Sequence, residues 1–198
     1  MSVSNSRLGT VAKWSAIPVG LILSAALVWQ ASYSAFSATT SNPTNNWATG
    51  TVALSDDDSN TAMFNATTLK PGSTGTKCIA VTSTGTLAAA VKLYGTGVAT
   101  TNALSSYVNL TVQQGTGGSF ASCVGFVQDA GAPNLFTGTL AAFATAYTNF
   151  GNGFGTWTPA GGTVSKTYQI VYTIDAATPN SAQGSTASIG LTWESQNS

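Results

Sequence analysis

Residues 69–94 read LKPGSTGTKCIAVTSTGTLAAAVKLY, and this stretch contains the pattern that decides the fold. Pro71-Gly72 is typical of the centre of a tight turn, and the small residues at 83–86 predict a second turn. A short, mostly apolar run follows each turn, and these runs predict strands at 77–82 and 87–94. A unit that alternates turns with short strands indicates an all-β domain.

The rest of the chain repeats this pattern. It predicts about eight short strands in total and one short helix, which is typical of an all-β sandwich of the jelly-roll or Greek-key type. Alternating or apolar runs place the remaining strands, and Leu140, Phe143 and Tyr147 lie near helical spacing. The predicted strands are 47–54, 62–69, 107–114, 122–128, 164–174 and 185–194, and the predicted helix is 135–147.

The composition is unusually poor in charge. Only 6% of the 198 residues are charged and histidine is absent, whereas 43% are hydrophobic and 10% aromatic. That apolar content argues for a real core rather than a disordered chain. Without a basic patch, nucleic-acid binding is not expected. A nearly neutral surface offers little repulsion between copies, which favours self-association.

The N-terminus resembles a secretory leader. Arg7 and Lys13 precede an uncharged, mostly apolar run at 14–29, which as a helix would span roughly 24 Å and is short for a membrane anchor. Small residues end the leader, so cleavage is expected between Ser34 and Ala35. An uncleaved anchor is the alternative.

Export defines the expected organisation and location. We expect a signal peptide at 1–34, an extended segment at 35–46 and a β-sandwich domain at 47–198. The mature chain is then secreted, and lies at the cell surface or in an extracellular matrix. It meets a signal peptidase and touches the membrane only before cleavage.

The two cysteines, Cys78 and Cys123, form an even pair in an oxidising compartment, so a disulfide is predicted. The alternative is two free thiols, one of them catalytic. Because the chain has no histidine to act as a base, a Cys–His nucleophile is excluded.

The segment at 35–46 is a candidate donor strand. A sandwich has open sheet edges, and this chain uses very few charges to protect them. An uncharged, extended segment at a free terminus can complete such an edge through main-chain hydrogen bonds. The alternatives are a frayed terminus or a segment folded onto its own sheet. The expected donor residues are Ala35, Phe36, Ser37, Ala38, Thr39, Thr40, Ser41, Asn42, Pro43, Thr44, Asn45 and Asn46.

Few residues suggest a metal or ligand site. Asp56, Asp57 and Asp58 are a weak calcium candidate, because three adjacent aspartates on a turn do not all point one way. The aromatic and glycine-rich loop at 150–157 fits either a carbohydrate platform or a cap on the core.

Catalytic residues are not expected either. Without histidine the usual zinc ligand sets are missing, and nothing suggests that Asp129, Asp175 or the 56–58 cluster meet to form an acid–base pair. We expect no cofactor, no resident metal and no enzymatic activity.

Several stretches together resemble the TasA/camelysin family of exported bacterial proteins. The opening AFSATTSNPTNNWATGTVALSDDD is similar to the start of mature family members. MFNATTLKPGSTGTKCIAVTSTGTLAAAVKLY resembles the family's L-K-P-G turn between strands, and GSTASIGLTWESQ resembles its last strand. The likeness covers the first half of the mature chain and, loosely, its end.

The resemblance implies a jelly-roll subunit whose leader is removed by a dedicated signal peptidase of the SipW type. It also implies a subunit of a biofilm-matrix fibre, in which the N-terminal segment of one copy completes the sheet of the next. Copies of the chain itself are therefore the expected partners, with matrix polysaccharide as a further candidate. The alternatives are a monomeric secreted or surface-attached binding module, and a camelysin-type metallo-endopeptidase, which the missing histidine disfavours.

Overall fold

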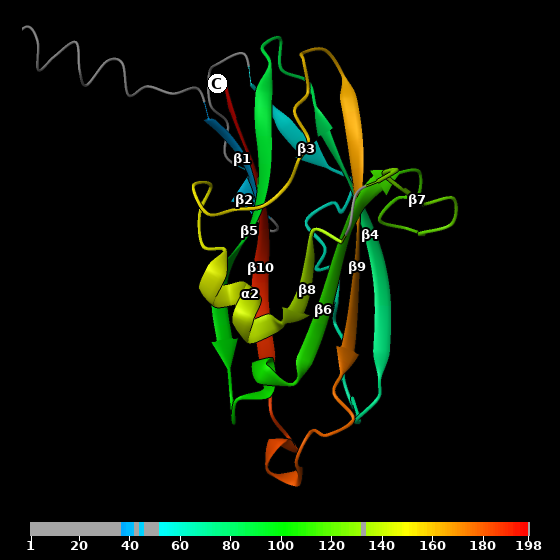
Figure 1. Ribbon diagram of the computed structural model, residues 1–198, viewed down its shortest axis with the longest axis vertical. Helices are drawn as coiled ribbons and strands as arrows, with labels where there is room; N and C mark the ends of the chain where they lie inside the picture. The colour runs from blue at the N-terminus through cyan, green and yellow to red at the C-terminus, as the bar shows by residue number, and fades with distance from the viewer. Residues whose placement is uncertain (1–36, 42–43, 46–51, 132–133, 198) are drawn as a thin grey trace, which may run out of the picture. The chain divides into compact units, whose positions relative to one another are not determined.

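Two antiparallel sheets face each other in the computed structural model of the chain (Figure 1). The structure describes residues 37–41, 44–45, 52–131 and 134–197. All of these belong to one compact unit, Phe36–Ser198. The predicted class, an all-β sandwich with one short helix, is confirmed.

The first sheet, called here the β10 sheet, contains four strands in the order β2-β1-β10-β5. The terminal strand β1 pairs with β10 on one side and with the short β2 on the other. Its strands are β1 (Ser37–Ser41), β2 (Thr44–Asn45), β5 (Ala89–Thr100) and β10 (Ala187–Asn197).

The second sheet, called the β9 sheet, contains six strands in the order β3-β4-β9-β6-β7, with β8 also paired to β6. One α-helix, α2 (Leu140–Ala146), follows β8 directly, and two 3-10 turns occupy Leu104–Ser106 and Asn180–Ala182. The strands are β3 (Leu54–Asp56), β4 (Thr74–Ser83), β6 (Val108–Thr116), β7 (Val127–Gln128), β8 (Phe136–Thr139) and β9 (Val164–Ile174).

The strand order is that of a jelly roll. β1, β10 and β5 are neighbours in one layer, and β4, β9, β6 and β8 are neighbours in the other. The chain visits the layers in the order expected for two Greek keys. The eighth position, beside β5, is occupied by residues 147–159, which are not a regular strand but hydrogen-bond to β5. We call residues 147–159 the sealing segment.

Alternation along the strands builds the core between the two sheets. Ile79 and Val81 of β4 are fully buried, and so are Tyr168 of β9 and Trp193 of β10, whose rings lie 5.4 Å apart. Because successive side chains of a strand point to opposite faces, the period of two in the sequence selects these residues. The remaining members of the core cluster are Met63, Val91, Leu93, Leu110, Val112, Leu140, Phe143, Trp157 and Ile170.

The clearest sequence patterns gave the right strands. The prediction at 77–82 is confirmed as the centre of β4, that at 164–174 as the whole of β9, and that at 107–114 as most of β6. The prediction at 87–94 matches only the first half of β5, and the last prediction matches β10 with an offset of two to three residues. The Pro71-Gly72 turn is also confirmed. Gly72 has a φ of 82°, and the Ser73 N–H donates to the Lys70 carbonyl at 2.9 Å, as in a turn that needs glycine at its third position.

The strand predicted at 62–69 is wrong, because this stretch forms no strand. Met63 is buried in the core, and its neighbour Phe64 packs edge-on against Tyr172 with ring centroids 5.1 Å apart. Adjacent side chains of a strand cannot both face the core, so the chain crosses the side of the sandwich as an irregular segment. Thr68, with a positive φ of 55°, also breaks extended geometry.

The strand predicted at 122–128 is mostly wrong, since only Val127 and Gln128 pair, with β6. Ser119 and Ser122 form a tight turn, and Gly125 has a φ of 83°. Cys123 must reach Cys78 on β4, which holds this part of the chain in a loop. We call residues 117–126 the latched loop.

Two further boundaries are corrected by tertiary contacts. The helix predicted at 135–147 begins only at Leu140, because residues 136–139 pair with β6 and the Thr139 side chain then accepts the Ala142 N–H at 3.1 Å. The strand predicted at 47–54 starts at Leu54 and continues to Asp56, into the predicted turn. Residues 47–51 lie outside the described part.

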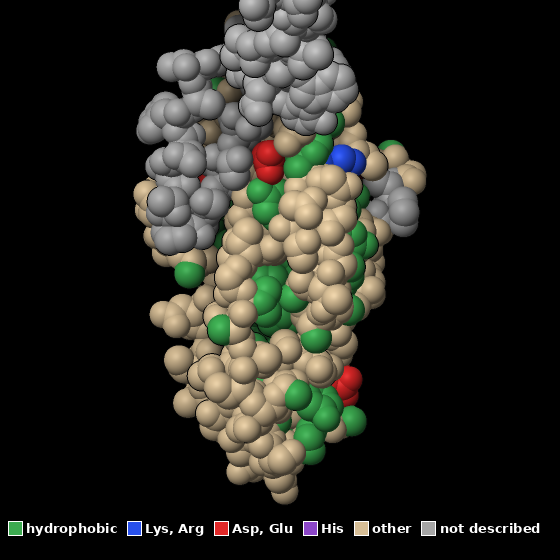
Figure 2. Space-filling view, turned by 90° about the vertical axis from the view of Figure 1, so that its left-hand side faces the viewer, with side chains coloured by type: hydrophobic (Ala, Val, Ile, Leu, Met, Phe, Trp, Pro, Cys, Tyr) green, Lys and Arg blue, Asp and Glu red, His purple; other side chains and the backbone are tan. Residues whose placement is uncertain are grey.

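Charged side chains are sparse on the described surface. Figure 2 shows a face of the molecule on which uncharged polar groups and scattered hydrophobic side chains dominate. The described surface is therefore as poor in charge as the whole sequence, and it offers little charge repulsion to a second copy.

Candidate functional site

The first candidate site is the outer edge of β10, which β1 covers. Five consecutive residues of β1 pair with β10, from Ser37 opposite Gln196 to Ser41 opposite Thr192. The expected donor segment is thus placed in part: its residues 37–41 and 44–45 are strands, and they lie on the sheet of their own chain. Residues 35–36, 42–43 and 46 lie outside the described part, as does the expected cleavage site between Ser34 and Ala35.

Strand β3 lies beside this edge. It pairs with β4 through Leu54, Ser55 and Asp56, opposite Ser83, Thr82 and Val81, and it also lies against β1 and β10. A strand of the β9 sheet therefore reaches the terminal strand of the β10 sheet.

The opposite edge of the same sheet, along β5, is closed by the sealing segment. Four alternate N–H groups of β5 donate to its carbonyls: Ala89 to Pro159, Val91 to Trp157, Leu93 to Phe154 and Gly95 to Tyr147, at 2.7 to 3.0 Å. The Lys92 ammonium adds a bond to the Gly155 carbonyl at 2.8 Å. No other described segment completes the hydrogen bonds of this edge.

Gly155 permits this close approach. Its φ is 137°, and a Cβ at this position would lie 2.8 Å from the Val91 carbonyl oxygen. A side chain would therefore push the sealing segment away from β5.

Two aromatic residues of the sealing segment, Phe154 and Trp157, pack into the core. Trp157 is 7% exposed, and the Phe154 ring packs edge-on against Phe143 and Tyr147 and is stacked with Phe136. Of the two interpretations of the 150–157 loop, the cap on the core describes Trp157 and Phe154. These two rings do not form an exposed platform for a sugar.

A shallow hollow of about 560 Å³ lies beside Phe154. The charged and amide side chains at this hollow already form hydrogen bonds within the protein. Asp129 is bound by the Lys166 ammonium at 2.7 and 2.8 Å and by the Gln114 amide at 2.8 Å, and that amide also reaches Thr156 at 3.3 Å. Lys166, more than any other group, holds the pKa of Asp129 below its usual value. The hollow therefore offers few unused polar groups to a ligand.

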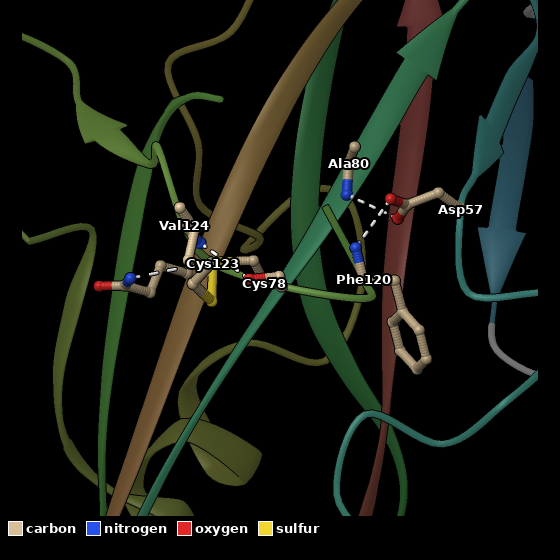
Figure 3. The surroundings of a disulfide bond; sticks show 8 residues. Asp57, Cys78, Ala80, Phe120, Cys123 and Val124 are labelled. Carbon is tan, nitrogen blue, oxygen red and sulfur yellow. Dashed lines mark hydrogen bonds between the residues drawn. A yellow bond between two sulfur atoms is a disulfide. The ribbon is translucent and has the colours of Figure 1, made fainter. Parts of the chain in front are cut away.

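The predicted disulfide between Cys78 and Cys123 is present and fixes the latched loop on the outside of β4 (Figure 3). Asp57 adds a second attachment, because its two carboxylate oxygens accept the Ala80 and Phe120 N–H groups, both at 2.8 Å. The Lys77 ammonium lies 5.3 Å from the centre of the Phe120 ring. Sequence reasoning missed this role of Asp57, since nothing local links position 57 to position 120.

The three aspartates of the calcium candidate do different things. Asp57 turns to β4 and the latched loop, whereas Asp58 is buried, with 2% exposed, and accepts the Asn60 N–H at 2.7 Å. Among the described residues, no group of three or more acidic, cysteine or histidine side chains is arranged to hold a metal ion.

The other carboxylates considered for acid–base chemistry stand apart in the structure. Asp175 accepts the Ala177 N–H at 2.8 Å and the Asn109 amide at 3.3 Å, so it is a local capping group. Asp129 is paired with Lys166.

No protein-family model matches the sequence, and no curated protein matches it. In the part that the structure describes, no helix is both long and apolar enough to span a membrane. The geometry of the chain itself must therefore support any functional assignment.

Proposed function

We propose that this chain is an exported structural protein of the TasA/camelysin type, a subunit of an extracellular fibre. One copy donates its N-terminal strand to the sheet of the next copy. The observation that carries the proposal is the position of β1, a terminal strand that completes the β10 edge. The neutral surface and the disulfide, which suits an oxidising compartment, support it.

The acceptor in this proposal is the edge of β10 between Thr192 and Gln196. Because β1 is the first element of the sandwich, it can leave this edge without threading past another strand. A second copy of β1 would then restore the same hydrogen bonds, so exchange between chains costs little free energy. Repeated head-to-tail, such exchange builds an open filament rather than a closed dimer.

The second candidate is a monomeric secreted or surface-attached binding module. Its supporting observation is that β1 lies on β10 of the same chain. Both candidates use the same pairing, and they differ only in which chain supplies β1.

A cross-link between paired positions separates the two. Ser37 lies opposite Gln196, so Ser37→Cys with Gln196→Cys places two thiols side by side on one face of the sheet. We expect the oxidised chain from Ala35 onward, under conditions where it assembles, to give a ladder of covalent oligomers on a non-reducing gel, and filaments by negative-stain electron microscopy.

The matched control is Thr74→Cys with Thr173→Cys, a pair that joins β4 to β9 inside one sandwich. It should give only a monomer band. A monomer band for the Ser37 and Gln196 pair at every concentration, without filaments, would contradict donation and favour the monomeric module. A chain starting at Trp47 should form no filaments in either case.

A further inference from the structure

Asn152 and Gly153 form the only asparagine–glycine step in the sequence, and this step lies in the sealing segment. An asparagine before glycine is prone to deamidation, because glycine has no Cβ to shield its amide nitrogen or to restrict the backbone. That nitrogen can attack the side-chain carbonyl carbon of the asparagine. Asn152 is exposed, so water and base reach it and burial does not protect it.

Hydrogen bonds within the turn at 148–152 hold the side chain of Asn152. Its Oδ1 accepts the Thr148 N–H at 2.8 Å and the Asn149 N–H at 2.9 Å, and its Nδ2 donates to the Thr148 hydroxyl at 3.1 Å. In return, the Asn149 Oδ1 accepts the Asn152 N–H at 3.3 Å. Ring closure would break the Cγ–Nδ2 bond and pull the side chain into the plane of the new ring, so these hydrogen bonds oppose it.

The attacking nitrogen is restrained as well. The Gly153 N–H donates to the Phe150 carbonyl at 3.2 Å, and this proton has to leave before the nitrogen can attack. The backbone of Gly153 also lies close to β5, since a Cβ there would be 3.0 Å from the Lys92 Cβ and 3.2 Å from the Leu93 carbonyl oxygen. The next residue, Phe154, exchanges two backbone hydrogen bonds with Leu93, at 2.7 and 3.1 Å. The turn is therefore fixed for as long as the sealing segment stays on β5.

We propose that Asn152 is a site of spontaneous deamidation that the closed β5 edge suppresses. When the segment opens, base takes the Gly153 amide proton, the Gly153 nitrogen bonds to the Asn152 Cγ, and the Cγ–Nδ2 bond breaks with release of ammonia. Water then opens the cyclic imide at either of its carbonyl groups, which gives aspartate or isoaspartate at position 152. Water is the only other reactant, and no oxidant or cofactor takes part.

The two products have different consequences for the edge. Aspartate keeps a side-chain oxygen for the Thr148 and Asn149 N–H groups, so the turn re-forms. Isoaspartate routes the main chain through the former side chain and adds a methylene group to it. This extra length lies between Tyr147 and Phe154, two residues whose backbones bond to β5. The edge then no longer closes in register, so isoaspartate marks and preserves an opening that has occurred. This property belongs to one chain and does not depend on the proposed fibre.

Mass spectrometry of the disulfide-bonded chain from Ala35 to Ser198, which holds both sheets and the whole core, tests the proposal. The chain is incubated in mildly alkaline buffer, once folded and once unfolded in urea. The peptide that contains position 152 is then analysed for aspartate and isoaspartate, which separate by chromatography. We expect deamidation of the folded chain to be at least about tenfold slower, because opening has to precede the reaction. Equal rates in the two states would overturn the proposal.

Gly155→Ala opens the edge without changing the turn, because its Cβ would lie 2.8 Å from the Val91 carbonyl oxygen. We expect this variant to raise the rate at Asn152 severalfold, toward that of the unfolded chain. The internal control is Asn180, which precedes Ser181 in a 3-10 turn outside the sealing segment. Its rate should be the same in the parent and in the variant.

Thr148→Val is a second variant, which loosens the reacting side chain rather than the edge. It removes the hydroxyl that the Asn152 Nδ2 binds and should also raise the rate, so the test stays valid if Gly155→Ala does not fold. A rate at Asn152 that stays at the parent value in each variant that folds would overturn the proposal.

Hydrogen exchange tests the consequence for the edge. In chains that carry isoaspartate at 152, separated by ion-exchange chromatography, the Leu93 and Gly95 amides should lose at least about tenfold in protection. The Asn152→Asp variant is the matched control, because it carries the same added charge on an unaltered main chain, and it should keep these amides protected. Parent-like protection in the isoaspartate form would show that the edge closes again and would overturn the proposal.

Discussion

The β10 sheet has two edges, and the chain closes them in different ways. Along β5, the sealing segment forms five backbone hydrogen bonds with the strand and inserts Trp157 and Phe154 into the core. It is held in the chain at both ends, by α2 and by β9. Along β10, the closure is a terminal strand of five residues joined by backbone pairing.

Under the proposed donation of β1, one sheet has a permanent edge along β5 and an exchangeable edge along β10. A segment with buried aromatic anchors leaves only when the core opens. A terminal strand leaves without disturbing the order of the others. The low charge of the chain protects neither edge, so physical cover is the protection that the described edges have.

The largest expected effect breaks the permanent edge. Trp157→Ala removes a buried indole from the core and should lower the free energy of unfolding by about 3–5 kcal/mol. Urea unfolding measures the loss. Hydrogen exchange should show that the amides of Ala89, Val91, Leu93 and Gly95 lose protection, whereas a chain without β1 keeps them protected. Equal loss in both variants would contradict the comparison.

The next effect is remote from both edges. Replacing Cys78 and Cys123 by alanine removes a cross-link that spans 45 residues of sequence, and should lower the free energy of unfolding by about 2–4 kcal/mol. The amides of the latched loop should exchange faster, because the disulfide no longer holds it. They should keep part of their protection, because Asp57 and Lys77 remain as its attachments. The amides of the β5 edge should still be better protected from exchange than those of the β10 edge. Selective opening of the β10 edge would instead connect the disulfide to strand donation.

The smallest expected effect concerns the hydrogen bonds that support the closure along β5. Asp129→Asn weakens the link from Lys166 through Gln114 to Thr156 of the sealing segment, and should cost about 1–2 kcal/mol at pH 7. Since the pKa of Asp129 is lowered in the folded state, its contribution is present above the unfolded value of about 3.9 and is lost as pH falls through the folded value.

Thermal unfolding of the parent and the Asp129→Asn variant at pH 7 and pH 2.5 measures this contribution. The two melting temperatures should converge at the lower pH. Burial raises the pKa of Asp58 to about 6, which is the opposite direction, so an identical pH response in Asp58→Asn and Asp129→Asn would show that one of the two assignments is wrong.

The sequence by itself determined the fold class and the disulfide. Alternation along β4, β6 and β9, together with the Pro71-Gly72 turn, is enforced by local backbone geometry and by the period of two that burial imposes on a strand. An even pair of cysteines predicts a cross-link without further information. These features depend on neighbours in the sequence.

Tertiary structure alone decided the rest. Residues 62–69 do not form the expected strand, because the adjacent residues Met63 and Phe64 both pack against the core. The sealing segment occupies a strand position although it is not a regular strand. Asp57 accepts hydrogen bonds from the Ala80 and Phe120 N–H groups, for reasons that no local pattern carries. Edges and long-range caps are set by contacts between residues far apart in the chain, and a sequence pattern records only the near ones.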